Sequence, residues 1–155
     1  MKLSRRWFVG LLTAAALTRS AKMALADETI VKVHKDPNCG CCTGWVQHLR
    51  DAGFTVQVDE TSDLEPVRTR LAVPAALAAC HTAEVDGYVI EGHVPAPAVR
   101  RLLSQRPEVR GLSVPGMPVG SPGMEGGSRQ PYTVLSFGAA GPKPFMRFVG
   151  TEPAG

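Results

Sequence analysis

Outside its first 26 residues, the 155-residue sequence has no excess of positive charge. Residues 1–26 hold five of the 17 basic side chains and none of the 14 acidic ones, which leaves residues 27–155 with 12 basic and 14 acidic side chains. A part of the chain with a net charge of about −2 has no basic excess with which to attract nucleic acid or an anionic membrane surface. We therefore expect neither as a partner.

The sequence also lacks an apolar run long enough to span a bilayer, because residues 7–17 fall short of the roughly 20 residues that a spanning helix needs. This run follows the paired arginines Arg5 and Arg6, and it precedes the small-x-small sequence at residues 24–26. Together these features predict a twin-arginine-like export signal, residues 1–26, that is cleaved before Asp27. We expect the remaining chain to reside in the periplasm and to have no membrane association.

Residues 27–155 show no internal repeat and no sign of a second domain, and they are numerous enough to bury a core without disulfides. Residues 111–130 are too rich in Gly and Pro for regular structure and are expected to form a loop. The other patterns alternate strand and helix, which predicts an α/β fold: a single thioredoxin-like domain with a mixed four-stranded sheet flanked by helices. The expected elements are strand 28–35, helix 43–52, strand 54–59, helix 63–71, a short helix 75–80, strand 87–91, helix 95–105, strand 132–137 and an edge strand 145–149.

Three of the four cysteines, Cys39, Cys41 and Cys42, lie in the turn between the first expected strand and the first expected helix. Unpaired backbone N–H groups and the helix dipole favour a thiolate at such a position. A thiolate is the nucleophile of disulfide exchange and also a ligand for soft metals. Cys39 and Cys42 have the C-x-x-C redox spacing, and Cys41 adds either a second disulfide register or a third metal ligand. The turn is therefore expected to be a chemical site.

The fourth cysteine, Cys80, is followed directly by His81, and His93 follows the expected strand 87–91. Ligands usually bind at the strand ends of one edge of an α/β sheet. A single histidine is more often a hydrogen-bonded residue than a ligand, but His81 adjoins a cysteine and His34 lies just before the cysteine turn. All three histidines are candidate ligands. The alternative for Cys80 is a disulfide with one of the other cysteines, and the sequence does not select a pairing.

Two methionines, Met117 and Met124, occupy near-duplicate Pro-Gly-Met turns of the expected loop. A thioether sulfur is a soft ligand suited to Cu(I), which makes both methionines candidate copper ligands. The alternative is that both simply pack against the sheet.

Four separated motifs of this sequence together resemble the CopG-like periplasmic proteins, a family formerly known only as a domain of unknown function. The motifs are His34–Cys42, Cys80–Thr82, Gly87–Pro95 and Val114–Met124. The resemblance spans about residues 30–137 and implies a thioredoxin-like fold and a role in copper resistance. It implies thiolate ligands for copper at Cys39, Cys41, Cys42 and Cys80, with further contributions from His34, His81, His93, Met117 and Met124.

The sequence thus predicts an exported copper-binding protein that holds Cu(I) at a Cys-rich site and can couple binding to thiol redox chemistry. Its expected partners are copper ions and other periplasmic copper-handling proteins. The main alternative is a thiol–disulfide oxidoreductase in which Cys39 attacks and Cys42 resolves, although the additional Cys41 counts against it. An iron–sulfur carrier, a zinc site and a disulfide-stapled binding module are further alternatives.

Overall fold

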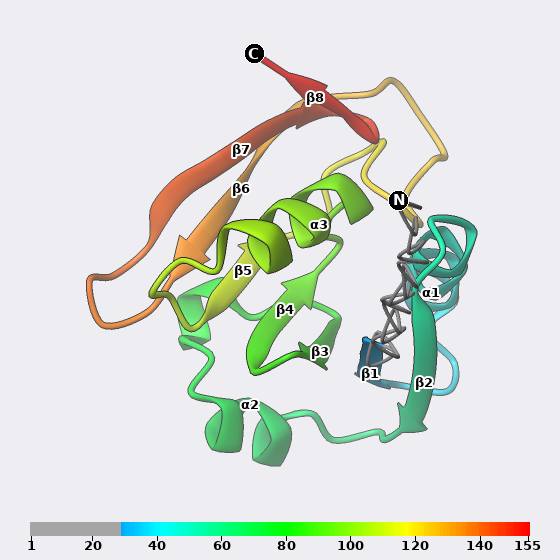
Figure 1. Cartoon of the computed structure of the whole chain (residues 1–155). Coiled ribbons are helices and arrows are strands. Elements are labelled where there is room, and N and C mark those ends of the chain that lie inside the picture. The colour runs from blue at the N-terminus through cyan, green and yellow to red at the C-terminus, as the bar shows by residue number, and fades with distance from the viewer. Residues whose placement is uncertain (1–28) are drawn as a thin grey trace, which may run out of the picture.

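The structure, a computed structural model, describes residues 29–155 and arranges them around one mixed sheet of eight strands (Figure 1). The order across the sheet is β2-β1-β3-β4-β5-β6-β7-β8. The strands are β1 (Ile30–Lys35), β2 (Thr55–Glu60), β3 (His81–Val85), β4 (Tyr88–Gly92), β5 (Gly111–Val114), β6 (Pro131–Phe137), β7 (Lys143–Val149) and β8 (Glu152–Ala154). The helices are α1 (Gly40–Asp51), α2 (Glu65–Leu71) and α3 (Ala96–Gln105), with a 3-10 turn η1 (Ala75–Leu77).

The predicted export signal, residues 1–26, lies outside the described residues. Within residues 29–155, no helix has both the length and the apolar character needed to cross a membrane.

The α/β class is confirmed, but the predicted sheet of four strands is wrong, because the structure has eight. The prediction omits β3, β5 and β8, whose sequences HTAEV, GLSV and EPA contain few large apolar residues. Strand β5 is short and begins with a glycine, yet all four of its residues are buried between β4 and β6. The loop expected over residues 111–130 therefore begins only after Val114. The short helix expected over 75–80 is reduced to the three residues of η1.

The larger core lies between α1, α3 and one face of the sheet. Successive side chains of a strand point to opposite faces, and the paired residues Val33, Ala83 and Ile90 share this face. They belong to one buried cluster with Trp45 of α1 and Leu102 of α3. The cluster fixes α1, and with it the cysteine turn, against this face of the sheet.

The opposite face carries α2 and a smaller core in which Leu71, Val89 and Phe137 are buried together. The strand register places Thr82, Glu84 and Glu91 on this second face. Strands β3 and β4 are therefore largely apolar toward α1 and partly polar toward α2.

The four motifs meet at one end of the sheet because of the strand register. Lys35, at the end of β1, lies opposite His81, at the start of β3. Strand β4 runs back alongside β3 and ends at Gly92, which lies opposite Val114 at the end of β5. Four segments therefore leave the sheet at the same end: those that follow β1, β4 and β5, and the one that precedes β3.

Helix α3 obtains its N-terminal cap from α1. Its own N-cap residue, Pro95, offers no side-chain hydrogen bond, and the backbone N–H of Ala96 instead donates to Nε2 of His48 at 3.0 Å. A ring nitrogen that accepts this bond must be unprotonated. Burial lowers the pKa of His48 below its usual value, which favours this neutral form.

The cap makes folding stability depend on pH. An unfolded histidine has a pKa of about 6.5, so below that value the unfolded chain binds a proton at His48 that the folded chain does not, and stability falls. One such group contributes a slope of at most about 1.4 kcal/mol per pH unit. We predict that metal-free wild-type protein loses more unfolding free energy between about pH 7.5 and about pH 5.5 than His48→Gln, whose amide oxygen accepts the same bond without titrating. Urea unfolding at both pH values measures this, and equal losses in the two proteins would contradict the prediction.

Candidate metal centre

The cysteine turn lies at the N-terminus of α1, as predicted. Cys39 is the N-cap residue, and the backbone N–H of Cys42 donates to its Sγ at 3.4 Å. The helix begins at Gly40, three residues before the predicted start, so Cys41 and Cys42 occupy its first turn. The first turn of α1 thus holds these three sulfurs close to one another.

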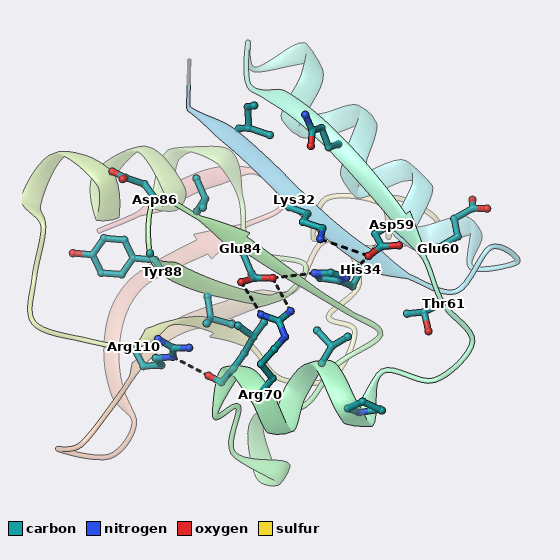
Figure 2. Close-up of a pocket in the computed structure, with 18 of the residues that line it drawn as sticks. Lys32, His34, Asp59, Glu60, Thr61, Arg70, Glu84, Asp86, Tyr88 and Arg110 are labelled. Atoms are coloured by element: carbon teal, nitrogen blue, oxygen red, sulfur yellow. Dashed lines mark hydrogen bonds and ion pairs between the residues drawn. The ribbon is translucent and has the colours of Figure 1, made fainter. Parts of the chain in front are cut away.

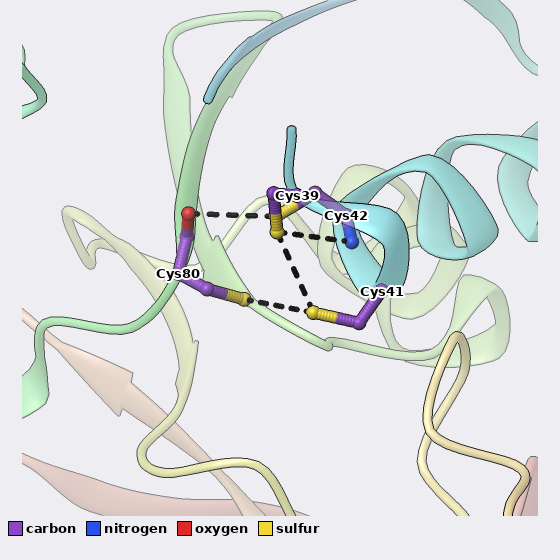
Figure 3. A group of neighbouring side chains, drawn as sticks. All are labelled: Cys39, Cys41, Cys42 and Cys80. Carbon is purple, nitrogen blue, oxygen red and sulfur yellow. Dashed lines mark hydrogen bonds between the residues drawn. A yellow bond between two sulfur atoms is a disulfide. The ribbon is translucent and has the colours of Figure 1, made fainter. Parts of the chain in front are cut away.

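All four cysteine sulfurs lie within 4.8 Å of one another (Figure 3). A disulfide joins Cys39 and Cys42, whereas Cys41 and Cys80 are free thiols. The Sγ of Cys41 lies 3.5 Å from the Sγ of Cys39 and 4.0 Å from the Sγ of Cys80. The structure thus brings Cys80 to the cysteine turn without the alternative disulfide between Cys80 and that turn.

Two histidines extend this group on the other side of Cys80. The Sγ of Cys80 lies 2.9 Å from Nε2 of His93 and 3.4 Å from Nδ1 of His81. His93 follows Gly92, whose φ of +70° turns the chain at the end of β4, where an added Cβ would come within 2.6 Å of the Cβ of Ala79. The result is a second set of three donors, one sulfur and two imidazoles, that shares Cys80 with the first set.

The hydrogen bonds of His93 show which of its ring nitrogens can accept a bond from the Cys80 sulfur. Its Nδ1–H donates to the carbonyl oxygen of Pro122 at 2.7 Å, which leaves Nε2 unprotonated and directed at Cys80. Burial and, to a smaller extent, the nearby Cys41 raise the pKa of the Cys80 thiol to about 12. The metal-free Cys80 therefore donates its S–H to His93. Cys80 is thus a protonated thiol. The thiolate that a helix N-terminus favours is not expected at Cys80, because Cys80 is not part of α1.

The ring of His81 is fully buried and packs against Trp45, with ring centroids 4.4 Å apart. Burial and, to a smaller extent, the neighbouring His93 lower its pKa to about 3, so the ring is neutral at physiological pH. Among the described residues, the Nε2 of His81 is the one buried side-chain nitrogen or oxygen without a hydrogen-bond partner. Soft sulfurs beside neutral imidazoles, one of them with an unsatisfied nitrogen, are a donor set that fits copper.

The loop after β5 covers the cysteine turn. Gly123 has a φ of +87°, and a Cβ on it would lie 2.3 Å from the carbonyl oxygen of Cys41. This close approach brings the preceding carbonyl, that of Pro122, to His93. Met124 follows directly and is half-buried, whereas Met117 is 54% exposed. Of the two candidate methionines, the structure places only Met124 in the segment that adjoins the cysteine turn.

His34 is not brought to the cysteines. It projects from the opposite face of the sheet, where its Nε2 lies 3.0 Å from Glu84 and its Nδ1 lies 3.2 Å from Asp59 (Figure 2). There it lines an open groove of about 1270 Å³, and none of the four cysteines contributes to the lining. Both of its ring nitrogens face carboxylates.

Two charged residues that contact Ala79, the residue before Cys80, are not among the predicted site residues. Glu91 is fully buried and accepts a hydrogen bond from the backbone N–H of Ala79, and Arg68 of α2 donates to the same carboxylate. A glutamate inside the otherwise apolar strand Tyr88–Gly92 is a signal of a buried, paired charge and could have identified Glu91. Nothing in the sequence distinguishes Arg68 from the other arginines.

These features define an α/β protein with a thiol-rich candidate metal centre at one end of its sheet. The family model described as "Protein of unknown function, DUF411" matches residues 77–124. The solved structure of copper resistance protein CopG, form 2, is 42% identical, with a TM-score of 0.73, and the match covers 79% of this chain and 99% of that one. Form 1 is 41% identical, with a TM-score of 0.74, and the match covers 80% of this chain and 100% of that one. A search of curated proteins finds no match.

The chain therefore belongs to the family of copper resistance protein CopG, which confirms the resemblance of its four motifs. In a member of this family, the cluster of cysteines and histidines fits a copper-related function.

The contact between the loop and α1 can be tested at Gly123. We predict that Gly123→Ala lowers the unfolding free energy by at least about 1–3 kcal/mol, because its backbone conformation is strained for alanine and the added Cβ clashes with Cys41. Gly126→Ala is the matched control in the same loop, since nothing lies within 4 Å of a Cβ at that position. Urea unfolding of both variants measures the effect, and equal stabilities would contradict the contact.

Proposed function

We propose that this protein binds copper as Cu(I) at the sulfurs of Cys39, Cys41, Cys42 and Cys80. The observation that carries the proposal is the convergence of these four sulfurs, from α1 and from the segment before β3, within 4.8 Å. Several soft sulfur donors in one place favour Cu(I) over harder ions. A copper-related function of the family is consistent with this ligand set.

His93 and His81 complete the proposed site, because both are neutral and both lie within 3.4 Å of the Cys80 sulfur. Met124 is included as a weaker contributor on account of its place in the covering loop. His34 is left out, because Glu84 and Asp59 occupy both of its ring nitrogens on the other face of the sheet.

We further propose that copper binding is coupled to thiol redox chemistry. In the fully reduced protein, Cys39 and Cys42 can each give one electron to a Cu(II) ion, so that two Cu(II) become two Cu(I), two protons are released and one disulfide forms. The disulfide between these two cysteines supports this pairing. Cys41 and Cys80, the latter beside the histidines, then remain as thiols, a smaller ligand set that holds Cu(I) less tightly than the four sulfurs of the reduced protein.

The proposal also includes a thioredoxin-like fold and export. The order β2-β1-β3-β4, with β1 and β2 parallel and joined through α1, and with β3 and β4 antiparallel and followed by α3, supports a thioredoxin-like unit that β5–β8 extend. The twin-arginine-like sequence at residues 1–26 supports export to the periplasm, with other copper-handling proteins there as partners. A twin-arginine route carries folded proteins, which would allow copper to be loaded before export.

Competition with a chromophoric Cu(I) chelator tests the ligand set. Reduced wild-type protein is expected to bind Cu(I) tightly, and Cys39→Ser, Cys42→Ser and Cys80→Ser are each expected to abolish tight binding because each removes a thiolate donor. Met124→Leu is expected to weaken binding modestly. His34→Gln is the control and is expected to bind as tightly as the wild type. Unchanged affinity in the cysteine variants would contradict the proposal.

A second candidate, a thiol–disulfide oxidoreductase acting on proteins, is favoured by the Cys39–Cys42 disulfide at a helix N-terminus. The two functions differ in what oxidises the thiols. We predict that Cu(II) added without oxygen to reduced wild-type protein consumes two thiols for every two Cu(I) formed, and that Cys39→Ser loses this stoichiometry. Thiol counting and a Cu(I)-specific chelator measure it. Rapid reduction of insulin disulfides by the metal-free protein, together with no thiol loss to Cu(II), would favour the second candidate instead.

A further inference from the structure

Glu91 is a fully buried carboxylate on the face of the sheet opposite α1. One of its oxygens accepts from the Nε–H of Arg68 at 3.1 Å and from the backbone N–H of Ala79 at 2.7 Å. The other oxygen accepts from the hydroxyl of Thr82 at 2.6 Å. The carboxylate thus has three donors from three separate segments.

Arg68 completes this arrangement from α2. Its side chain is 14% exposed, its Nε–H donates to Glu91, and one terminal nitrogen donates to the carbonyl oxygen of Ala79. The N–H and the carbonyl group of Ala79 are therefore both held by the same ion pair. The planar guanidinium fork allows one side chain to bind a carboxylate and a carbonyl at once.

The position of Ala79 gives this ion pair its significance, because Cys80 is the next residue. The segment between η1 and β3 has no helix or strand of its own. Two further hydrogen bonds hold its start: the N–H of Ala78 donates to the carbonyl of Ala75 at 3.3 Å, and the Ser113 hydroxyl donates to the carbonyl of Leu77 at 2.9 Å. The direction in which the Cys80 side chain leaves the backbone is thus set by a peptide that Arg68 and Glu91 hold. Burying a charge as completely as that of Glu91 is costly unless every partner is in place. The location of this ion pair directly before Cys80 therefore points to a role in placing that cysteine.

We propose that Arg68 and Glu91 are positioning residues for Cys80: a buried ion pair, on the far face of the sheet from the cysteine turn, fixes the Ala79 peptide and so holds the Cys80 sulfur where it meets Cys41 and His93. The proposal rests on the proposed role of Cys80 as a copper ligand. The partners that orient a metal ligand typically affect affinity although they do not touch the metal.

A second ion pair between α2 and the sheet provides a matched control. Arg70 donates to Glu84 at 2.9 and 3.1 Å, from the same helix and to the same face, but these side chains are 52% and 32% exposed. Among the described contacts, neither residue reaches the backbone at Ala79 or Cys80. Glu84→Gln therefore removes a comparable charge pair without releasing the segment that carries the cysteine.

The test compares Glu91→Gln with Glu84→Gln in Cu(I) competition titrations. Glu91→Gln is expected to lower Cu(I) affinity by about 10- to 100-fold, the range for residues that orient a metal ligand, whereas Glu84→Gln is expected to change it by less than about fivefold. In a Cys80→Ser background only weak Cu(I) binding remains, and a weaker competing chelator measures it. Glu91→Gln is expected to leave this residual affinity unchanged, because the ligand that it positions is gone. An equal fall in both backgrounds would overturn the proposal.

Alkylation of the metal-free protein tests the same idea without copper. Iodoacetamide labelling followed by peptide mapping is expected to show faster alkylation of Cys80 in Glu91→Gln and an unchanged rate at Cys41. An unchanged Cys80 rate in the folded variant would overturn the positioning role. Equal Cu(I) affinity of wild type and Cys80→Ser would instead contradict the proposed function, so the two failures are distinguishable.

Thr82 keeps the test available if Glu91→Gln does not fold. Thr82→Val leaves the ion pair intact but removes one donor to the Glu91 carboxylate, and it is expected to shift affinity and Cys80 alkylation in the same direction by a smaller factor. Thr82→Ser retains the hydroxyl and is expected to behave as the wild type. Wild-type behaviour of Thr82→Val in both measurements would count against the proposal.

Discussion

The contact between Cys80 and the first turn of α1 is the interaction on which the site depends. Its sulfur lies 4.0 Å from the sulfur of Cys41 on one side and 2.9 Å from the ring of His93 on the other. Cys80 is thus the one residue common to the four-sulfur group and to the group with the two histidines. Without it, the chain would have a C-x-x-C turn and two buried histidines with no shared donor.

The sheet makes this contact possible because its two faces serve different purposes. On the face toward α1 and α3, Val33, Ala83 and Ile90 exclude water and anchor the helix that carries three of the cysteines. On the face toward α2, Thr82 and Glu91 of the same strands form a polar network that holds the chain just before Cys80. Because side chains alternate along β3 and β4, the same two strands contribute to the hydrophobic core on one face and help to place the Cys80 sulfur from the other.

The sequence allows much of this organisation to be predicted, because the signals involved are local. The C-x-C-C turn, the adjacent pair Cys80-His81 and the position of His93 after a strand are each visible within a few residues. What cannot be predicted depends on long-range pairing. Strand β3 carries a histidine, a threonine and a glutamate, and it is recognisable as a strand only once β1 and β4 are known to flank it.

His34 shows the limit of local reasoning most clearly. It lies closer in the sequence to the cysteine turn than His93 does, yet the strand period directs it to the other face, toward Asp59 and Glu84. His93 follows the cysteine turn by more than 50 positions, yet it lies against the sulfur of Cys80 beside that turn, because Gly92 turns the chain at the end of β4. Proximity along the chain and proximity in space therefore select different histidines, and only the pairing of β1 with β3 and of β3 with β4 distinguishes them.

The metal-free protein maintains the proposed site at a cost in stability. The Nε2 of His81 is buried without a partner, and an unsatisfied buried polar group costs about 1–3 kcal/mol. The Cys80 thiol is likewise held in surroundings that disfavour its charged form. A metal ion bound to Cys80 would supply the positive charge that stabilises a thiolate, and whatever binds only the folded state adds to its stability. The same burial that disfavours an uncompensated thiolate at Cys80 thus favours binding of a soft cation there, because the cation neutralises the charge that burial opposes.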